Sequence, residues 1–187
     1  MKKIVVIGPE STGKSTLCEK LAAHYKTSWC PEYAREYLLE HGTDYSFENL
    51  LDVAKGQVAL EEKYIKEIET KQHIVGNAHS PLTTRHSLLF IDTDMYVMNV
   101  WCQFVFGKTH SWILDQITQR KYDLYLLCNV DLPWVKDELR EYPDLERREQ
   151  LYNIYKEIML NQSVPWIDIS GNYDERLQKA ITAVDKL

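Results

Sequence analysis

Short apolar runs rich in β-branched residues alternate along the chain with longer segments in which apolar residues recur every three or four positions. A parallel strand buried on both faces is apolar throughout, whereas a helix packed on a core buries one face. The runs therefore predict strands, and the segments with helical spacing predict helices. The predicted strands cover 2–7, 27–30, 88–91, 122–127 and 165–169. The predicted helices cover 15–25, 32–40, 47–68, 95–105, 111–120, 149–160 and 177–184.

The order of these elements predicts an α/β fold. Strands that alternate with helices form a parallel sheet, and the crossover connections place helices on both of its faces. We expect a three-layer sandwich with a five-stranded parallel sheet. No repeat, linker or low-complexity tract interrupts the chain, so a single domain over 1–187 is expected. Residues 131–148 are rich in charge, poor in apolar residues and contain two prolines, which predicts a mobile lid over about 131–150.

Residues 8–15 read GPESTGKS and match the phosphate-loop pattern G-x-x-x-x-G-K-[ST], which places the fold among the P-loop NTPases. The match follows a predicted strand and opens a predicted helix, as the pattern requires. Backbone N–H groups of such a loop converge on phosphate, and the helix N-terminus adds partial positive charge. We expect Lys14 to bridge the β- and γ-phosphates of ATP and the Ser15 hydroxyl to hold Mg²⁺. The other expected ATP ligands are Gly8, Glu10, Ser11, Thr12, Gly13 and Thr16.

Acids that follow two of the predicted strands are further candidates. Asp92 ends a buried run, and the carboxyl end of such a strand faces the crevice where α/β sheets bind ligands. Asp92 is expected to bind Mg²⁺ directly or through water, because the alternative role of helix N-cap better suits Thr93 or Asp94. Glu32 follows the second strand, where an acid can accept a hydroxyl proton or grip a sugar. Glu32 and Asp92 therefore both remain candidates for the catalytic base.

Arginines and a glycine are candidates for the remaining contacts. Arg140, Arg147 and Arg148 lie in the predicted lid, where a guanidinium can stabilise charge on the transferring phosphoryl group. Of these, Arg140 is expected to be catalytic, and the alternative for all three is a solvated helix face. Arg35 is expected to bind the acceptor or phosphate, with a helix-surface charge as its alternative. Gly171 follows the last strand and is expected beside adenine, or as a plain turn residue.

Composition narrows the classes of function. The net charge is −6 without a basic stripe, so a nucleic-acid partner is not expected. No apolar run is long enough to cross a bilayer and the N-terminus does not resemble a secretion signal, which predicts a cytoplasmic protein. The four cysteines are scattered without metal-type pairing and are expected to be buried free thiols.

The phosphate loop by itself does not name a reaction. A GTPase needs an Asn-Lys-x-Asp motif, and residues 129–131 lack that spacing. A mechanical ATPase of the AAA type usually needs a larger module than this chain. A small-molecule kinase needs an acceptor pocket and a lid that excludes water. The sequence offers candidates for both, so a kinase is the leading hypothesis and a nucleotide-dependent regulatory ATPase module is the alternative.

Five blocks together resemble the nicotinamide riboside kinase domain of the NadR-type NAD-salvage proteins. They read GPESTGKS at 8–15, EYARE at 32–36, FIDTD at 90–94, GKTH at 107–110 and WVKDELR at 134–140. The resemblance implies that ATP and Mg²⁺ support phosphate transfer to the 5′-hydroxyl of nicotinamide riboside, giving nicotinamide mononucleotide. It also implies an acceptor site that includes Glu32, Tyr33, Arg35 and Asp94.

The chain departs from this family at the two positions expected to hold the nicotinamide ring. Pro31 stands where family members have a tryptophan, and the second aromatic position falls near Leu60. Trp29, Tyr33 or Trp101 can substitute, or can belong to the core. Another nucleoside or a vitamin alcohol therefore stays open as acceptor. Longer family members add an adenylyltransferase, for which this chain has no room, so we expect the reaction to stop at the mononucleotide.

Overall fold

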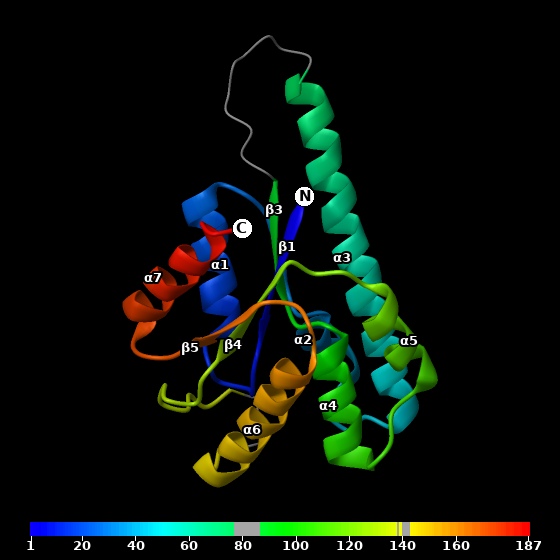
Figure 1. The fold of residues 1–187 in the computed structure, drawn as a ribbon. Coiled ribbons are helices and arrows are strands. Elements are labelled where there is room, and N and C mark those ends of the chain that lie inside the picture. The colour runs from blue at the N-terminus through cyan, green and yellow to red at the C-terminus, as the bar shows by residue number, and fades with distance from the viewer. Residues whose placement is uncertain (77–86, 138, 140–142) are drawn as a thin grey trace.

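The computed structural model describes residues 1–76, 87–137, 139 and 143–187. Within them the chain forms five strands and seven helices in an alternating order (Figure 1). The strands are β1 (Lys2–Ile7), β2 (Trp29–Cys30), β3 (Leu88–Asp92), β4 (Leu124–Cys128) and β5 (Trp166–Ile169). The helices are α1 (Lys14–Tyr25), α2 (Tyr33–His41), α3 (Phe47–Gly76), α4 (Met95–Phe106), α5 (Ser111–Gln119), α6 (Leu145–Asn161) and α7 (Tyr173–Val184).

The strands form one parallel sheet in the order β2-β3-β1-β4-β5. Alternate residues of the central strand β1 enter different layers, because successive strand side chains point to opposite faces. Val5 and Ile7 pack in a buried cluster with α3, α4 and α6, whereas Ile4 and Val6 pack with α1 and α7 (Figure 1). The predicted α/β sandwich with a five-stranded parallel sheet is confirmed.

The sheet register gathers three strand ends at one edge. Val6 of β1 pairs with Asp92 of β3, and Ile7 pairs with Leu127 of β4. The segments that follow β1, β3 and β4 therefore begin side by side. Ligands of open α/β sheets bind at such an edge, where the strand order reverses.

Two element boundaries differ from the prediction. Strand β4 begins at Leu124 instead of 122, and the two residues before it bond through their side chains: the Tyr122 hydroxyl donates to Glu61, and the Asp123 carboxylate accepts from the Lys3 backbone N–H. Helix α6 begins at Leu145 instead of after Arg148, because Asp144 caps it by accepting from the Arg147 backbone N–H at 2.8 Å. The last residues of the expected lid are thus the first turns of a helix.

A buried ion cluster fixes the long helix α3 to the sheet. Glu61 is 2 % exposed and accepts from Lys3 Nζ at 3.2 Å, from the Tyr122 hydroxyl at 2.9 Å and from Arg120 Nε at 3.2 Å. Arg120 also forms an ion pair with Glu61 through Nη2, at 3.1 Å. A buried carboxylate is tolerated when its oxygens are fully paired, as they are here.

The four cysteines are placed as the sequence predicted. Cys18, Cys30, Cys102 and Cys128 are buried free thiols, as predicted. In the part of the chain that the structure describes, no helix has the length and apolar content that crossing a membrane requires.

Candidate functional site

The phosphate loop joins β1 to α1 and depends on its two glycines. Gly8 has a φ of +137°, and a Cβ there would lie 2.6 Å from the Cys128 carbonyl oxygen. Gly13 caps α1 with a φ of +77°, and a Cβ there would lie 3.1 Å from Leu132. Both positions therefore require glycine, since an L side chain would meet positive φ and a close neighbour together.

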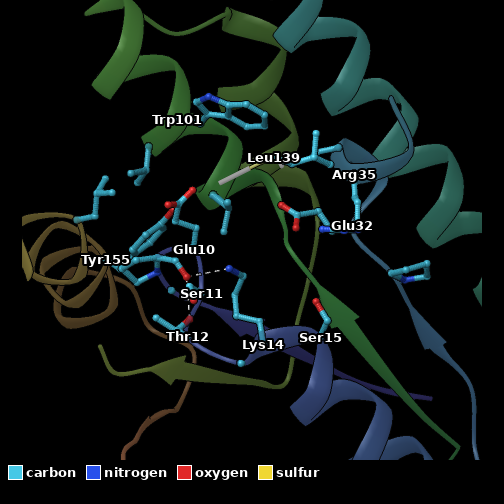
Figure 2. Close-up of a pocket in the computed structure, with 18 of the residues that line it drawn as sticks. Glu10, Ser11, Thr12, Lys14, Ser15, Glu32, Arg35, Trp101, Leu139 and Tyr155 are labelled. Carbon is cyan, nitrogen blue, oxygen red and sulfur yellow. Dashed lines mark hydrogen bonds between the residues drawn. The ribbon is translucent and has the colours of Figure 1, made fainter. Parts of the chain in front are cut away.

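Side chains of the loop fold back onto its own backbone. The Thr12 hydroxyl, which is fully buried, donates to the Pro9 carbonyl oxygen at 2.7 Å. Lys14 Nζ donates to the same oxygen at 3.0 Å (Figure 2). The ammonium group is thereby held over the loop, at the position from which it can exchange a neutral carbonyl for a phosphate oxygen.

Ser15 and Asp92 meet at the start of α1. The Ser15 hydroxyl donates to Asp92 Oδ2 at 2.5 Å, and Asp92 is fully buried. Burial raises the pKa of the Asp92 carboxyl to about 7, and the Glu32 charge adds to this, while Lys14 and the Ser15 hydrogen bond oppose it. Its other oxygen, Oδ1, is buried without a hydrogen-bond partner among the described residues.

The same two residues fit a magnesium ion. Mg²⁺ prefers hard oxygen ligands and commonly uses one or two protein oxygens together with substrate phosphates. The hydroxyl of Ser15 and the carboxyl of Asp92 are such ligands, and Oδ1 of Asp92 lacks a protein partner. Elsewhere in the described residues, no group of three or more His, Cys, Asp or Glu could hold a metal ion.

A cavity of about 340 Å³ extends from the phosphate loop toward α2, α4 and α6 (Figure 2). One end is lined by the loop residues Gly8 to Thr16, which include every loop residue expected to bind ATP. The other end is lined by Trp29, Pro31, Glu32, Ala34, Arg35, Leu38, Val97, Val100, Trp101, Phe104, Leu139, Leu151 and Tyr155. The phosphate loop and the expected acceptor side therefore share one space.

Glu32 and Arg35 lie where the sequence predicted them, on the wall of this cavity. Figure 2 shows the Glu32 carboxylate and the Arg35 side chain on the side opposite Glu10 and Ser11. Glu32 is the N-cap residue of α2, yet its side chain makes no capping hydrogen bond. Its carboxylate is thus left for the cavity instead of the helix end.

Two residues expected to bind the acceptor make contacts within the fold. Tyr33 does not line the cavity, because its ring lies on α3, where a Cβ on Gly56 would come within 2.0 Å of it. Asp94 is 2 % exposed and caps α4, accepting from the backbone N–H of Tyr96 at 3.0 Å and from the Tyr125 hydroxyl at 2.7 Å. Asp94 is thus the N-cap residue of α4, and acceptor binding by Tyr33 and Asp94 stays a prediction.

The segment after β4 lies against the phosphate loop. The Val135 backbone N–H donates to the Ser11 hydroxyl at 3.0 Å, and Trp134 Nε1 donates to Glu10 at 3.4 Å. Asp137 accepts two hydrogen bonds from the Arg35 guanidinium, at 3.0 and 3.3 Å. This fork joins α2 to the segment, so the two sides of the cavity are connected. Within the expected lid, Arg140 lies outside the described residues.

The other two arginines of the expected lid have different surroundings. The Arg147 side chain is 60 % exposed and pairs with Asp144. This placement agrees with the alternative prediction that the arginine lies on a solvated helix face. Arg148 is 3 % exposed and donates from Nη2 to the Ser11 carbonyl oxygen at 3.3 Å and to the Leu132 carbonyl oxygen at 3.4 Å. Arg148 is therefore neither a solvated lid residue nor one of the residues that line the cavity.

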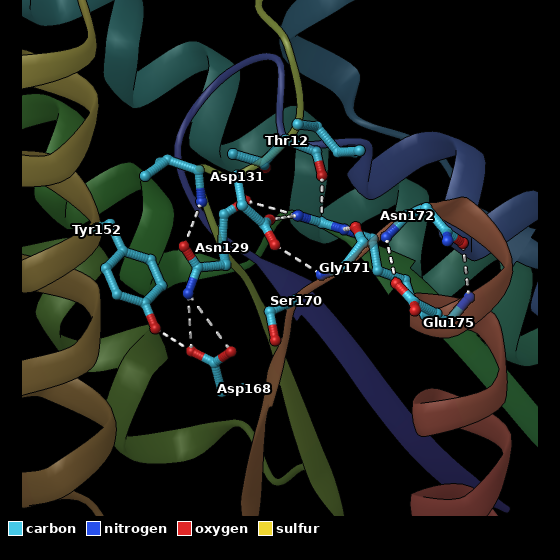
Figure 3. Close-up of polar contacts among 12 residues, drawn as sticks. Thr12, Asn129, Asp131, Tyr152, Asp168, Ser170, Gly171, Asn172 and Glu175 are labelled. Carbon is cyan, nitrogen blue, oxygen red and sulfur yellow. Dashed lines mark hydrogen bonds and ion pairs between the residues drawn. The ribbon is translucent and has the colours of Figure 1, made fainter.

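The turn after β5 is held by Arg176 of α7, a residue that the sequence analysis did not single out. Gly171 has a φ of +102° and does not line the cavity: its N–H donates to Asp131 at 2.6 Å, and its carbonyl oxygen accepts from Arg176 Nε at 2.7 Å (Figure 3). Arg176 is 2 % exposed. A signal was present, since Arg176 is one helical turn before Ala180 on the apolar stripe of α7.

Comparison with known proteins agrees with this fold. The family model described as AAA domain matches residues 3–176. The trifunctional NAD biosynthesis/regulator protein NadR of Salmonella typhimurium is 26% identical over the whole chain, and so is that of Escherichia coli; in each case the match covers 43% of the relative. The chain thus spans less than half the length of these curated relatives. The resemblance to NadR-type proteins is confirmed.

Solved structures show the same fold. A crystal structure of NadR protein in complex with NR superposes with a TM-score of 0.76 at 22% identity, covering 99% of this chain and 49% of that one. A thymidylate kinase from Ehrlichia chaffeensis superposes with a TM-score of 0.67 at 13% identity, covering 98% of each chain. The sheet order, the phosphate loop and the family match lead to one conclusion: this chain belongs to the AAA domain family.

Proposed function

We propose that this chain is an ATP-dependent kinase that phosphorylates a hydroxyl group of a small nucleoside, nicotinamide riboside. The observation that carries the proposal is the single cavity that runs from the phosphate loop to Glu32 and an apolar chamber. A kinase needs its phosphate donor and its acceptor in one water-excluding space, in line for transfer. The NadR relatives support the choice of acceptor, because one of their structures is a complex with NR.

The placement of the acids supports separate roles for the two candidate bases. Asp92 is buried against Ser15, so the two would hold Mg²⁺, which neutralises charge on the β- and γ-phosphates when bound. Glu32 lines the cavity without a capping role and would accept the hydrogen of the acceptor hydroxyl. Arg35 would bind the acceptor or phosphate from the same wall. Lys14 and the loop N–H groups would hold the triphosphate.

The apolar end of the cavity suits a flat ring. Leu60 packs against a core cluster and does not line the cavity, whereas Trp29 and Trp101 both do. The Trp101 indole is fixed by a hydrogen bond from Nε1 to the Tyr45 hydroxyl at 2.8 Å. A fixed indole offers a stacking face at low entropic cost. In this proposal Trp29 and Trp101 replace the aromatic residues that the family has at the positions of Pro31 and Leu60.

The test is a coupled ADP-release assay with Mg-ATP and a panel of acceptors that contains nicotinamide riboside, common nucleosides and thiamine. We expect nicotinamide riboside to stimulate ADP release most strongly, with nicotinamide mononucleotide as the product. If another member of the panel stimulates ADP release most strongly, the proposed kinase activity is kept and the proposed acceptor changes.

A nucleotide-dependent regulatory module is the second candidate, and the family's description as AAA domain favours it. It predicts ATP binding with no stimulation by any member of the panel and no phosphorylated small product. A protein partner that binds only the ATP-loaded form would then support this candidate.

The raised pKa of Asp92 gives a pH dependence to the proposed metal site. Mg²⁺ binds the ionised carboxylate, and the pKa of Asp92 is about 7, so protons compete with Mg²⁺ below that pH. The Mg²⁺ concentration that gives half-maximal ATP turnover should therefore fall as pH rises from 6 to 7 and level off above it. Asp92→Asn should raise this concentration about tenfold and abolish its pH dependence.

The matched control for Asp92→Asn is Asp115→Asn, which changes an exposed acid on α5. This control should keep both the Mg²⁺ requirement and its pH dependence. A Mg²⁺ requirement that is the same in Asp92→Asn as in the wild type would remove Asp92 from the proposed metal site.

A further inference from the structure

Three loops meet at the carboxyl edge of the sheet, where Figure 3 shows their residues Thr12, Asn129 and Gly171 close together, and Arg176 bonds to all three. Its Nη1 donates to the Thr12 carbonyl oxygen of the phosphate loop at 2.9 Å. Its Nη2 donates to the Asn129 carbonyl oxygen after β4 at 2.9 Å and pairs with the carboxylate of Asp131. Its Nε donates to the Gly171 carbonyl oxygen after β5. One buried guanidinium therefore ties the loops that follow β1, β4 and β5.

The contact with Thr12 constrains the direction of a backbone N–H group. A peptide unit is planar and trans, so the carbonyl of Thr12 and the N–H of Gly13 point to opposite sides. Because Arg176 holds this carbonyl toward the buried side, the Gly13 N–H must face the other way, toward the concave side of the loop. That side is part of the cavity wall.

Arg148 makes the corresponding contact one residue earlier. It reaches the loop from α6 and donates to the Ser11 carbonyl oxygen, which fixes the peptide that carries the Thr12 N–H. Arg148 and Arg176 thus hold two consecutive carbonyls from two different helices, and both side chains are at least nine-tenths buried. A reversed peptide would instead aim a carbonyl dipole at the phosphates, where it would repel them.

We propose that Arg176, together with Arg148, is a positioning residue that aims the N–H groups of Thr12 and Gly13 at the nucleotide phosphates. The charge of Arg176 is balanced by Asp131, so its contribution is orientation and not net positive charge. Arginine suits this role because its planar fork reaches several fixed acceptors at once, which a lysine ammonium on a single stem cannot do. The inference rests on the nucleotide-binding part of the proposed function and does not depend on the acceptor.

The test compares two buried, ion-paired arginines. Arg176→Lys removes the fork at the phosphate loop, and Arg120→Lys makes the same change at Glu61, on α3. For both variants and the wild type, calorimetry gives the affinity for Mg-ATP and for inorganic tripolyphosphate, and thermal melting gives the stability. We expect Arg176→Lys to weaken both ligands about tenfold and Arg120→Lys to keep both within about twofold, although each lowers the melting temperature.

A second variant distinguishes the loss of the arginine contacts from a general loss of stability. Asp131→Asn leaves Arg176 in place but weakens its ion pair and changes the partner of the Gly171 N–H. We expect a smaller loss of Mg-ATP and tripolyphosphate affinity, about threefold, together with a lower melting temperature, because the buried Arg176 loses its balancing charge. Wild-type affinity in Arg176→Lys, or equal losses in Arg176→Lys and Arg120→Lys, would overturn the proposal.

The binding measurements also separate this inference from the proposed function. A wild-type chain that does not bind Mg-ATP would contradict the nucleotide assignment itself. A wild-type chain that binds Mg-ATP but phosphorylates no acceptor would contradict only the proposed kinase activity. The positioning role of Arg176 would be unaffected.

Discussion

Lys14→Ala is expected to lower the kcat of ATP-dependent phosphorylation on the order of a hundredfold, a loss of about 3 kcal/mol of transition-state stabilisation. The ammonium group lies over the phosphate loop, where it donates to the Pro9 carbonyl oxygen. In the proposed reaction it would exchange this neutral acceptor for phosphate oxygens, whose charge increases toward the transition state. The measurement is kcat under saturating Mg-ATP, with the acceptor that the panel identifies.

The matched control is Lys20→Ala, on the same helix but away from the cavity. Lys20 pairs with Asp174 at 3.7 Å and lies over the Tyr173 ring, so the control removes a surface contact of similar size. It should keep kcat within about twofold, since exposed ion pairs contribute little. A Lys14→Ala enzyme with activity within a few-fold of wild type would contradict the assignment of Lys14 to the phosphates.

The parts of the fold that the sequence predicted best are those set by local pattern. Strand β1 has the predicted bounds, 2–7, and the phosphate loop follows it directly, because the apolar run and the glycines act over a few residues. The position of Asp92 beside Ser15 also agrees with the prediction, because Asp92 ends β3, Ser15 lies at the start of the helix that follows β1, and these two strands are parallel neighbours. Local sequence pattern is therefore sufficient to predict the part of the site that would bind phosphate.

The acceptor side was harder to predict because it depends on which way side chains turn between elements. Tyr33 and Glu32 are adjacent in sequence, yet Tyr33 lies on α3 at Gly56 and Glu32 faces the cavity. No local pattern distinguishes the two, since each is compatible with a helix N-terminus. The direction is decided by the missing side chain of Gly56, which leaves room for the tyrosine ring.

The burial of two arginines was not predicted, for a related reason. A charge in sequence reads as solvated unless its partners are known, and the partners of Arg148 and Arg176 are mostly backbone carbonyls. Carbonyl groups have no signature in the sequence. The burial of these two charges became evident only when the loops after β1, β4 and β5 were placed together.

Glu32→Gln is expected to lower kcat on the order of a hundredfold or more, while it leaves the affinity for Mg-ATP unchanged at a pH well above the pKa of Asp92, where that carboxyl is ionised in both proteins. The substitution keeps the size and the polar contacts of the side chain but cannot accept a proton. Glu32 makes no capping hydrogen bond in α2, so the fold should tolerate the change. The measurement is kcat with the identified acceptor, together with the calorimetric affinity for Mg-ATP.

The same variant has a second expected effect, which a purely structural residue would not produce. The negative charge of Glu32 raises the pKa of Asp92, so its removal should lower that pKa. The pH at which the Mg²⁺ requirement levels off should then move below 7. Glu36→Gln, an exposed change one turn along α2, should alter neither kcat nor this pH. If Glu32→Gln retains kcat but shifts the pH dependence, Glu32 acts on Asp92 electrostatically and the proton acceptor lies elsewhere.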